Sequence, residues 1–321
     1  MKGLLTIYLK ELQDHFSSSR FILLFTLILM VSLITAFMVG TGIRDELQGV
    51  AKPTFVFLML FSSPGKFFSL ISFIAFFGPL MGIVLGFDSI NRERSARTLS
   101  KLVSQPIYRD SIINGKFLAG SITIAIMLLA IILLISGLGL RLIGIVPGPE
   151  EIWRLAIYFL ISLFYISFWL GISILFSVIF RSMATSALAA IACWIFFSFF
   201  VAYGASLAAD AISPLDQRAP TSNPELLVQH EQTRRALSLL SPMTLYSEAT
   251  TTILDPLRKT TQSLLLMGPL ERLSISRFQS PLPLGESVHI VFPHLISLLA
   301  ITVLCFAISY VFFMRQEVRS T

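Results

Sequence analysis

Long uncharged apolar runs are the feature of this sequence that most restricts its fold. Six runs of at least 20 residues contain no Asp, Glu, Lys or Arg; they are Phe21–Gly40, Phe67–Phe87, Phe117–Leu140, Leu155–Phe180, Met183–Tyr203 and Val288–Met314. A helix needs about 20 apolar residues to cross the hydrocarbon core of a bilayer. Soluble core helices seldom stay uncharged over such a length, so we predict an all-α polytopic membrane protein with six transmembrane helices.

The overall composition restricts the function in the same direction. Hydrophobic residues make up 55% of the 321 residues and charged residues only 13%, which excludes a disordered chain, a nucleic-acid-binding basic domain and an ordinary soluble enzyme. Both cysteines, Cys193 and Cys305, lie inside apolar runs. Their isolation gives no support to a disulfide framework or a metal site.

The distribution of Lys and Arg predicts the orientation of the spans. The N-terminal segment, the second-to-third and fourth-to-fifth connections and the C-terminal tail carry twelve Lys and Arg, against five in the short loops of the opposite side. Short cytoplasmic loops are enriched in these residues. We therefore expect both termini to be cytoplasmic and the protein to be a multi-pass protein of the plasma (inner) membrane.

Two segments outside the spans are predicted to be helical. Residues 1–20 contain an amphipathic helix, with Leu5, Leu9 and Phe16 on its apolar stripe, which lies either in the headgroup plane or against the protein itself. Residues 21–203 hold spans one to five, and 288–321 hold the sixth span and a cytoplasmic tail. Between them, residues 204–287 form an extracytoplasmic helical cap with predicted helices over about 224–240 and 242–254, because each begins with a capping residue before Pro.

The cytoplasmic loop 88–116 carries six basic and three acidic residues. We predict a short helix over 90–103, ended before Pro106, and Asp110 as the N-cap of the third span. The loop either is solvated with its cations on lipid headgroups or, because its helix–break–helix pattern exceeds what orientation requires, forms a docking surface for a soluble partner.

Chemical groups for an autonomous activity are not evident in this sequence. The spans lack the ionisable residues that coupling ions and protons require at membrane depth. The Gly-Lys pairs at 65–66 and 115–116 lack the rest of a phosphate-binding loop. We therefore predict no catalytic residues and no resident metal or cofactor. Two rows of small residues are packing signals, because their four-residue spacing favours close helix–helix contact: Gly78, Gly82 and Gly86 in the second span, and Ser32, Ala36 and Gly40 in the first.

The cytoplasmic loop also resembles a known family. The pattern is Phe87-Asp88-x-Ile90-x-x-Glu93-Arg94-x-x-x-Thr98-Leu99-x-x-Leu102, then Pro106-x-x-Arg109, then Gly115-Lys116. It resembles the signature of ABC-2-type transporter permeases, and it is most similar to the branch containing the permease of the nitrous-oxide-reductase copper-maturation system. Arg97 stands where that branch usually has Gly. The run Leu240-Ser241-Pro242-x-x-Leu245-Tyr246-x-Glu248-Ala249 resembles the segment before the last span of such permeases.

The resemblance implies a half-transporter, expected to export its substrate, that pairs with a second permease subunit as a homodimer or heterodimer. A separate cytoplasmic ATPase dimer would bind ATP and Mg and dock on a coupling helix in loop 88–116. The residues implied to face this ATPase are Arg92, Glu93, Arg94, Arg97, Thr98 and Leu99, with Arg181 and Ser182 as a minor second contact.

Two other functions remain open at this point. One is an autonomous channel or carrier, against which the uncharged spans count. The other is a membrane scaffold or sensor that binds an extracytoplasmic partner through residues 204–287.

Overall fold

The computed structural model describes residues 2–46, 55–62, 69–98, 108–214, 224–256 and 281–315. These residues form helices and connecting turns, with no strand among them. Six helices in the described ranges are long and apolar enough to cross a membrane. The prediction of an all-α protein with six spans is confirmed.

The six candidate spans follow one another as expected. They are α2 (Ser19–Glu46), α4 (Leu70–Gly86), α7 (Arg109–Ile143), α8 (Pro149–Ile179), a fifth span that joins α9 (Met183–Ile195) to α10 (Val201–Ile212) through a π-helical turn at Phe196–Phe200, and α14 (Leu284–Arg315). Only Phe180, Arg181 and Ser182 separate α8 from α9. The short connection predicted there is therefore present.

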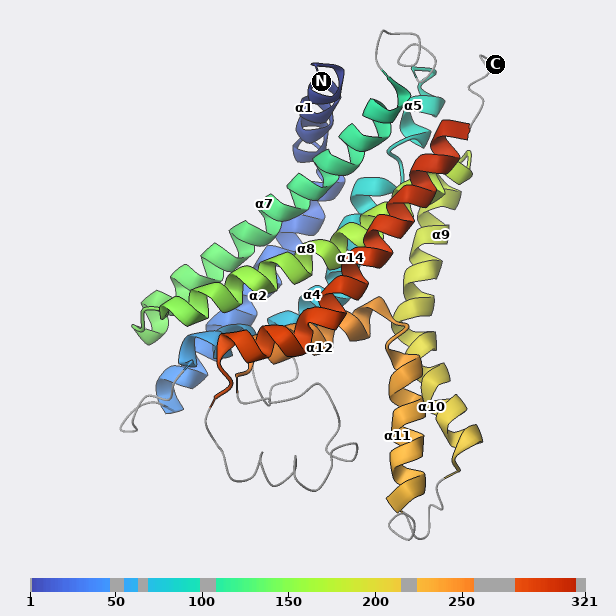
Figure 1. Ribbon diagram of the computed structural model, residues 1–321. Helices are drawn as coiled ribbons and strands as arrows, with labels where there is room; N and C mark the ends of the chain where they lie inside the picture. Colours follow the sequence, from blue (N-terminus) through green and yellow to red (C-terminus); the bar gives the residue numbers. More distant parts are fainter. Residues whose placement is uncertain are drawn as a thin grey trace.

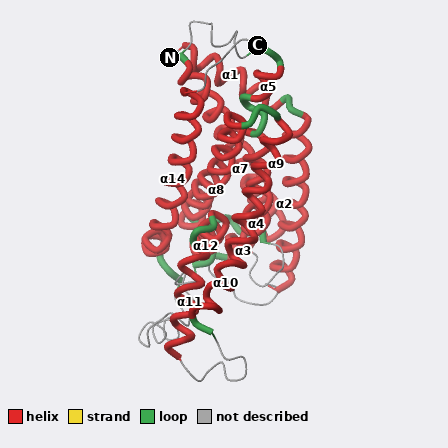
Figure 2. Tube along the Cα trace, turned by 90° about the vertical axis from the view of Figure 1, so that its right-hand side faces the viewer, coloured by secondary structure: helices red, strands yellow, loops and turns green. Residues whose placement is uncertain are grey.

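The shorter helices lie at the two ends of the bundle. α1 (Lys2–Phe16) and α5 (Asn91–Ser95) lie near the two chain termini, whereas α11 (Pro224–Ser238) pairs with α10 in a hairpin that projects from the opposite end (Figure 1). The view at right angles shows the same projection (Figure 2). α12 (Pro242–Leu254) packs on α8 and α14, and α3 (Met59–Ser62) follows a 3-10 turn at Val56–Leu58. The helices predicted over 224–240 and 242–254 thus differ from α11 and α12 by two residues at most.

Helices α4 and α8 form the centre of the bundle. Two-thirds of their most apolar windows are buried (67% in each), against 22% in α2, the fifth span and α14. The glycine row brings these two helices together, since an ideal Cβ on Gly82 would lie 2.6 Å from the carbonyl oxygen of Ile166. An ideal Cβ on Gly86 would lie 2.8 Å from Cβ of Ser173. Side chains at these positions would therefore hold the two backbones apart.

A proline inside α4 creates a second link to α8. Pro79 has no N–H, so the carbonyl of Ala75, four residues earlier, loses its helical donor. The hydroxyl of Tyr165 on α8 donates to that carbonyl at 2.6 Å. The Tyr165 ring stacks on Tyr246 of α12, with centroids 4.4 Å apart. A backbone group that lipid could not satisfy is thus paired by a neighbouring helix.

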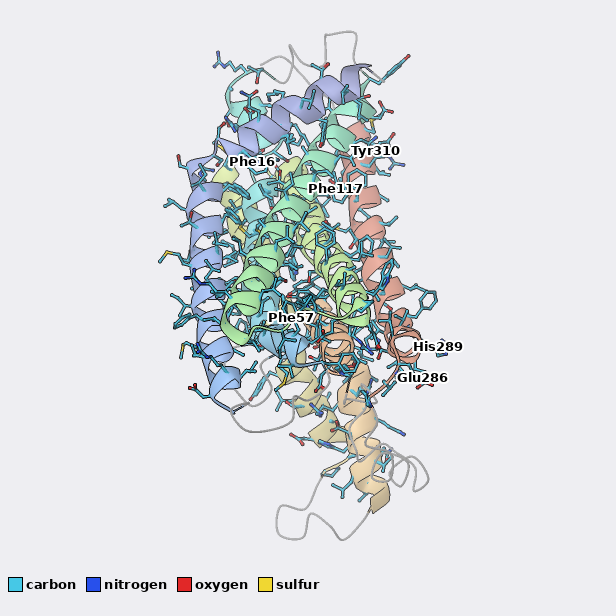
Figure 3. All side chains as sticks on the ribbon, turned by 90° about the vertical axis from the view of Figure 1, so that its left-hand side faces the viewer. Phe16, Phe57, Phe117, Glu286, His289 and Tyr310 are labelled. Atoms are coloured by element: carbon cyan, nitrogen blue, oxygen red, sulfur yellow. The ribbon has the colours of Figure 1, made fainter. Side chains whose placement is uncertain are left out.

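Helix α1 has one face buried against the protein and one exposed face. Ile7 and Glu11 are buried against α7, and Ile7 lies directly over Gly115. Leu5, Leu9 and Phe16 stay exposed, and Figure 3 shows Phe16 at the end of α1 that adjoins α2. The helix therefore packs on the protein and still presents an apolar stripe.

Candidate functional site

The candidate site is the α5 end of the bundle, where the loop after α4 folds back on itself. Ile90 and Asn91 donate their backbone N–H groups to Ser177 Oγ of α8, at 3.0 and 3.2 Å. Arg94 donates to the carbonyl of Phe180 at 3.1 Å, and Asn91 donates to that of Ser182 at 3.3 Å. The α5 helix and the α8–α9 connection, which the sequence suggested as separate contacts, therefore form one connected unit.

The helix predicted over 90–103 ends much earlier than expected. α5 stops at Ser95, and Arg97 adopts a left-handed conformation with φ 55°. The N–H of Arg97 bonds to the carbonyl of Arg94 at 3.1 Å, and that of Thr98 bonds to the carbonyl of Glu93 at 3.0 Å. This is the paired hydrogen bonding of a Schellman C-cap, a position that favours glycine. The family branch usually has Gly at this position, and the left-handed conformation observed there is one that Gly adopts without strain. Arg97 therefore replaces Gly at a position where the backbone favours Gly.

The N-cap predicted for the third span is also corrected. Tyr108 occupies the N-cap position of α7, and Asp110 lies in the first turn. The Asp110 carboxylate accepts from the backbone N–H of Ser111 at 2.7 Å. A carboxylate in the first turn still complements the helix dipole.

The residues predicted to face an ATPase have different environments. Arg92, Arg97 and Thr98 are exposed on and after α5, while Arg94 is half-buried. Glu93 is only 6% exposed and points into the protein. Leu99 lies outside the described residues. Arg181 and Ser182 are exposed beside α5.

Glu93 belongs to a buried cluster of charges that joins three segments. The Nζ atom of Lys116, on α7, lies 2.9 Å from Glu93 Oε1 and 2.8 Å from Glu11 Oε1 on α1. The more exposed Lys10 lies 2.9 Å from Glu11 and 3.5 Å from Glu93. The Lys116 side chain is 3% exposed, and both glutamate side chains are 8% exposed. The cluster therefore ties α5 to α1 and α7 in a poorly hydrated environment.

The electrostatics of α1 follow from these contacts. Burial alone would raise the pKa of Glu11, but Lys116 and Lys10 outweigh it and lower that pKa from 4.5 to about 2. Burial alone would lower the pKa of Lys10, and Glu11, Glu93 and Asp14 instead raise it to about 12. Both side chains are thus ionised at neutral pH.

A second buried charge lies at the opposite end of the bundle. Arg154, at 0% exposure, donates to the carbonyls of Ile253 and Leu282 at 2.9 and 2.6 Å. It also pairs with Glu150 at 2.8 Å and donates to Ser287 at 3.2 Å. In the Lys and Arg count from the sequence, Arg154 was one of the five cations assigned to the short loops opposite the termini. The available signal was its position four residues after Glu150, at the start of an apolar run.

These features define a polytopic membrane protein with a packed helical bundle and a compact, charged turn at the end where both termini lie. A family model described as ABC-2 family transporter protein matches residues 5–318. The chain therefore belongs to the ABC-2 family of transporter proteins, and it supplies the membrane-embedded permease part of an ABC transporter. A search of curated proteins found no match. The resemblance to the copper-maturation branch stays a prediction.

Proposed function

We propose that this permease is an exporter subunit of the plasma (inner) membrane, powered by a separate cytoplasmic ATPase dimer that docks on the α5 end. The observation that carries the proposal is that three cations are exposed at this end of the bundle: Arg92 of α5, Arg97 of its C-terminal turn and Arg181 of the adjoining connection. Glu93 is turned inward and paired with Lys116. The charges that α5 presents outward are therefore positive, which suits an acidic groove on the ATPase.

The orientation with both termini in the cytoplasm has two supports. The excess of Lys and Arg predicts it, and both termini lie at the same end of the bundle as α5 (Figure 1). In this orientation the hairpin of α10 and α11 faces the extracytoplasmic side. The exposed stripe of Leu5, Leu9 and Phe16 supports an interfacial position for α1.

The contacts around α5 supply a route from the ATPase to the spans. The Ser177 and Phe180 contacts link α5 to α8, the central helix, and the Lys116 cluster links it to α7. A displacement of α5 on ATP binding would therefore act on both helices together. ATP and Mg would bind in the partner ATPase, and a second permease, identical or not, would complete the transporter.

The test is association of the permease with a candidate partner ABC ATPase, coexpressed with it. Reversing two exposed cations, Arg97→Glu with Arg181→Glu, should weaken copurification and permease-stimulated ATP hydrolysis by about tenfold or more, since like charges across an interface cost several kcal/mol. Arg141→Glu is the matched control, because Arg141 is exposed at the other end of α7. Equal association of the double variant and the control would overturn the docking proposal.

One observation supports a second candidate function, that of a membrane scaffold. The hairpin of α10 and α11 projects beyond the bundle in both views (Figures 1 and 2). A scaffold that binds an extracytoplasmic partner through residues 204–287 would lose its function when the hairpin is deleted while ATPase association remains intact.

A further inference from the structure

A cavity of about 220 Å³ lies between α1, the start of α2, the end of α4 and α5. Four carboxylates and four Lys or Arg side chains line it, so with His15 neutral the cavity has no net charge. A bare anion would meet four carboxylates there, and a bare cation would meet Lys116 and its neighbours. The balance of charges suits a ligand that carries one charge of each sign.

Two residues that line the cavity each have a buried polar atom with no hydrogen-bond partner within the described ranges. These atoms are Glu93 Oε2 and Ser89 Oγ. Lys116 engages the other carboxylate oxygen, Glu93 Oε1. The backbone N–H of Arg92 bonds to the carbonyl of Asp88 at 2.8 Å, so this stretch is wound helically and Ser89 and Glu93 lie on one face. Buried acceptors of this kind call for a ligand with N–H donors.

The cavity lining also contains an exposed cation, Arg92, whose chemistry is opposite to that of the buried acceptors. Arg92 follows Asn91 in α5, is exposed, and makes no ion pair with any side chain that the structure describes. Its neighbour in the lining, Arg20, lies 3.2 Å from Asp88. A guanidinium in this position is suited to a phosphate, which it binds through paired N–H donors.

We propose that the cavity binds a phosphoethanolamine group, with the primary ammonium on Glu93 Oε2 and Ser89 Oγ and the phosphate on Arg92. The ammonium has three N–H donors for the two unpartnered acceptors. A quaternary ammonium, as in phosphocholine, has none. The phosphoethanolamine group can come from a phosphatidylethanolamine lipid or from a soluble phosphate compound, and the binding experiment distinguishes these two sources.

The test uses the full-length permease alone, purified in detergent and stripped of lipid, with binding measured by native mass spectrometry. Phosphatidylethanolamine should bind at least about tenfold more tightly than phosphatidylcholine or phosphatidylglycerol of the same chain length. Soluble glycerophosphoethanolamine is the second probe: weak competition identifies the lipid as the source, and competition at equal concentration identifies the free phosphate compound. Equal binding of the three lipids with no effect of the soluble probe overturns the proposal.

Variants locate the site. Arg92→Gln should weaken binding of phosphatidylethanolamine by about tenfold or more, as expected for loss of a charge-assisted hydrogen bond, and Arg141→Gln should leave it unchanged. Ser89→Ala should weaken binding several-fold without disturbing the Lys116 cluster. If Arg92→Gln and Ser89→Ala bind like their controls, the site is refuted. Since no ATPase is present, this result is independent of the docking experiment.

Discussion

Replacement of Lys116 by methionine should destabilise the permease strongly, because two buried carboxylates depend on that single ammonium. Its Nζ atom lies 2.8 Å from Glu11 and 2.9 Å from Glu93. Without it, Lys10 is the remaining cation of the cluster, and its side chain is 50% exposed. Breaking a buried ion pair from one side costs about 3–5 kcal/mol. The fall in the pKa of Glu11 from 4.5 to about 2 corresponds to roughly 3 kcal/mol at neutral pH.

The assay is the free energy of unfolding in bicelles, measured by titration with sodium dodecyl sulfate. Lys116→Met should lose about 3–5 kcal/mol. Lys10→Met is the control and should lose less than about 1 kcal/mol, because a half-exposed ion pair is screened by water. Adding Glu11→Gln to Lys116→Met should recover part of the loss, since one unpaired carboxylate disappears.

The pH dependence of the stability difference between Lys116→Met and the parent gives a second test. In the unsubstituted chain the pKa of Glu11 is depressed, so its contribution is complete above about pH 4.5 and is lost as the pH falls toward 2. In Lys116→Met the half-exposed Lys10 is the one cation left beside Glu11, so burial raises the pKa of Glu11 relative to the parent and protonation of Glu11 becomes less costly. The gap in stability between variant and parent should therefore shrink from pH 7.5 to 5.5. A gap that widens, or a loss no larger than that of Lys10→Met, would refute the assignment.

Three further substitutions test the packing and the turn, each by the same unfolding assay. Gly82→Ala should cost about 1–3 kcal/mol, because its Cβ would press on the Ile166 carbonyl; Gly137→Ala, whose Cβ would have no neighbouring atom within 4 Å, should be neutral or stabilising. Tyr165→Phe should cost about 1–3 kcal/mol by leaving the Ala75 carbonyl unpaired, whereas Tyr203→Phe, at an exposed ring, should change little. Arg97→Gly should stabilise the chain by about 0.5–1 kcal/mol because φ is 55° there, and a loss of stability at this position would contradict the strained turn.

The spans and the cap helices were predictable because their signals are local. Uncharged runs identify the spans, and Ser241 before Pro242 identifies the start of α12. The glycine row also predicted a close approach, although the sequence did not specify α8 as the partner. The end of α5 was missed because Arg97 has none of the freedom of glycine in left-handed conformations, and the hydrogen bonds around it overcome that preference.

The charge cluster could not be predicted, because its members are far apart in the sequence. Lys116 counted as a cytoplasmic cation and Glu93 as a docking residue, and both assignments treated charge as exposed. In the fold Gly115 lets Ile7 of α1 approach α7 closely. This contact places Glu11 beside Lys116. Charged side chains that the sequence suggests are exposed are therefore buried in the fold.

The central claim is that the α5 end faces the cytoplasm and is covered by the ATPase. The direct measurement is labelling of single cysteines with a membrane-impermeant maleimide, in a variant without Cys193 and Cys305. Arg97→Cys should be labelled only in inside-out vesicles and should be protected by the bound ATPase. Ala211→Cys, on exposed α10, should be labelled only from the opposite side. Labelling of Arg97→Cys from the outside, or labelling at the same rate with and without the ATPase, would contradict the account.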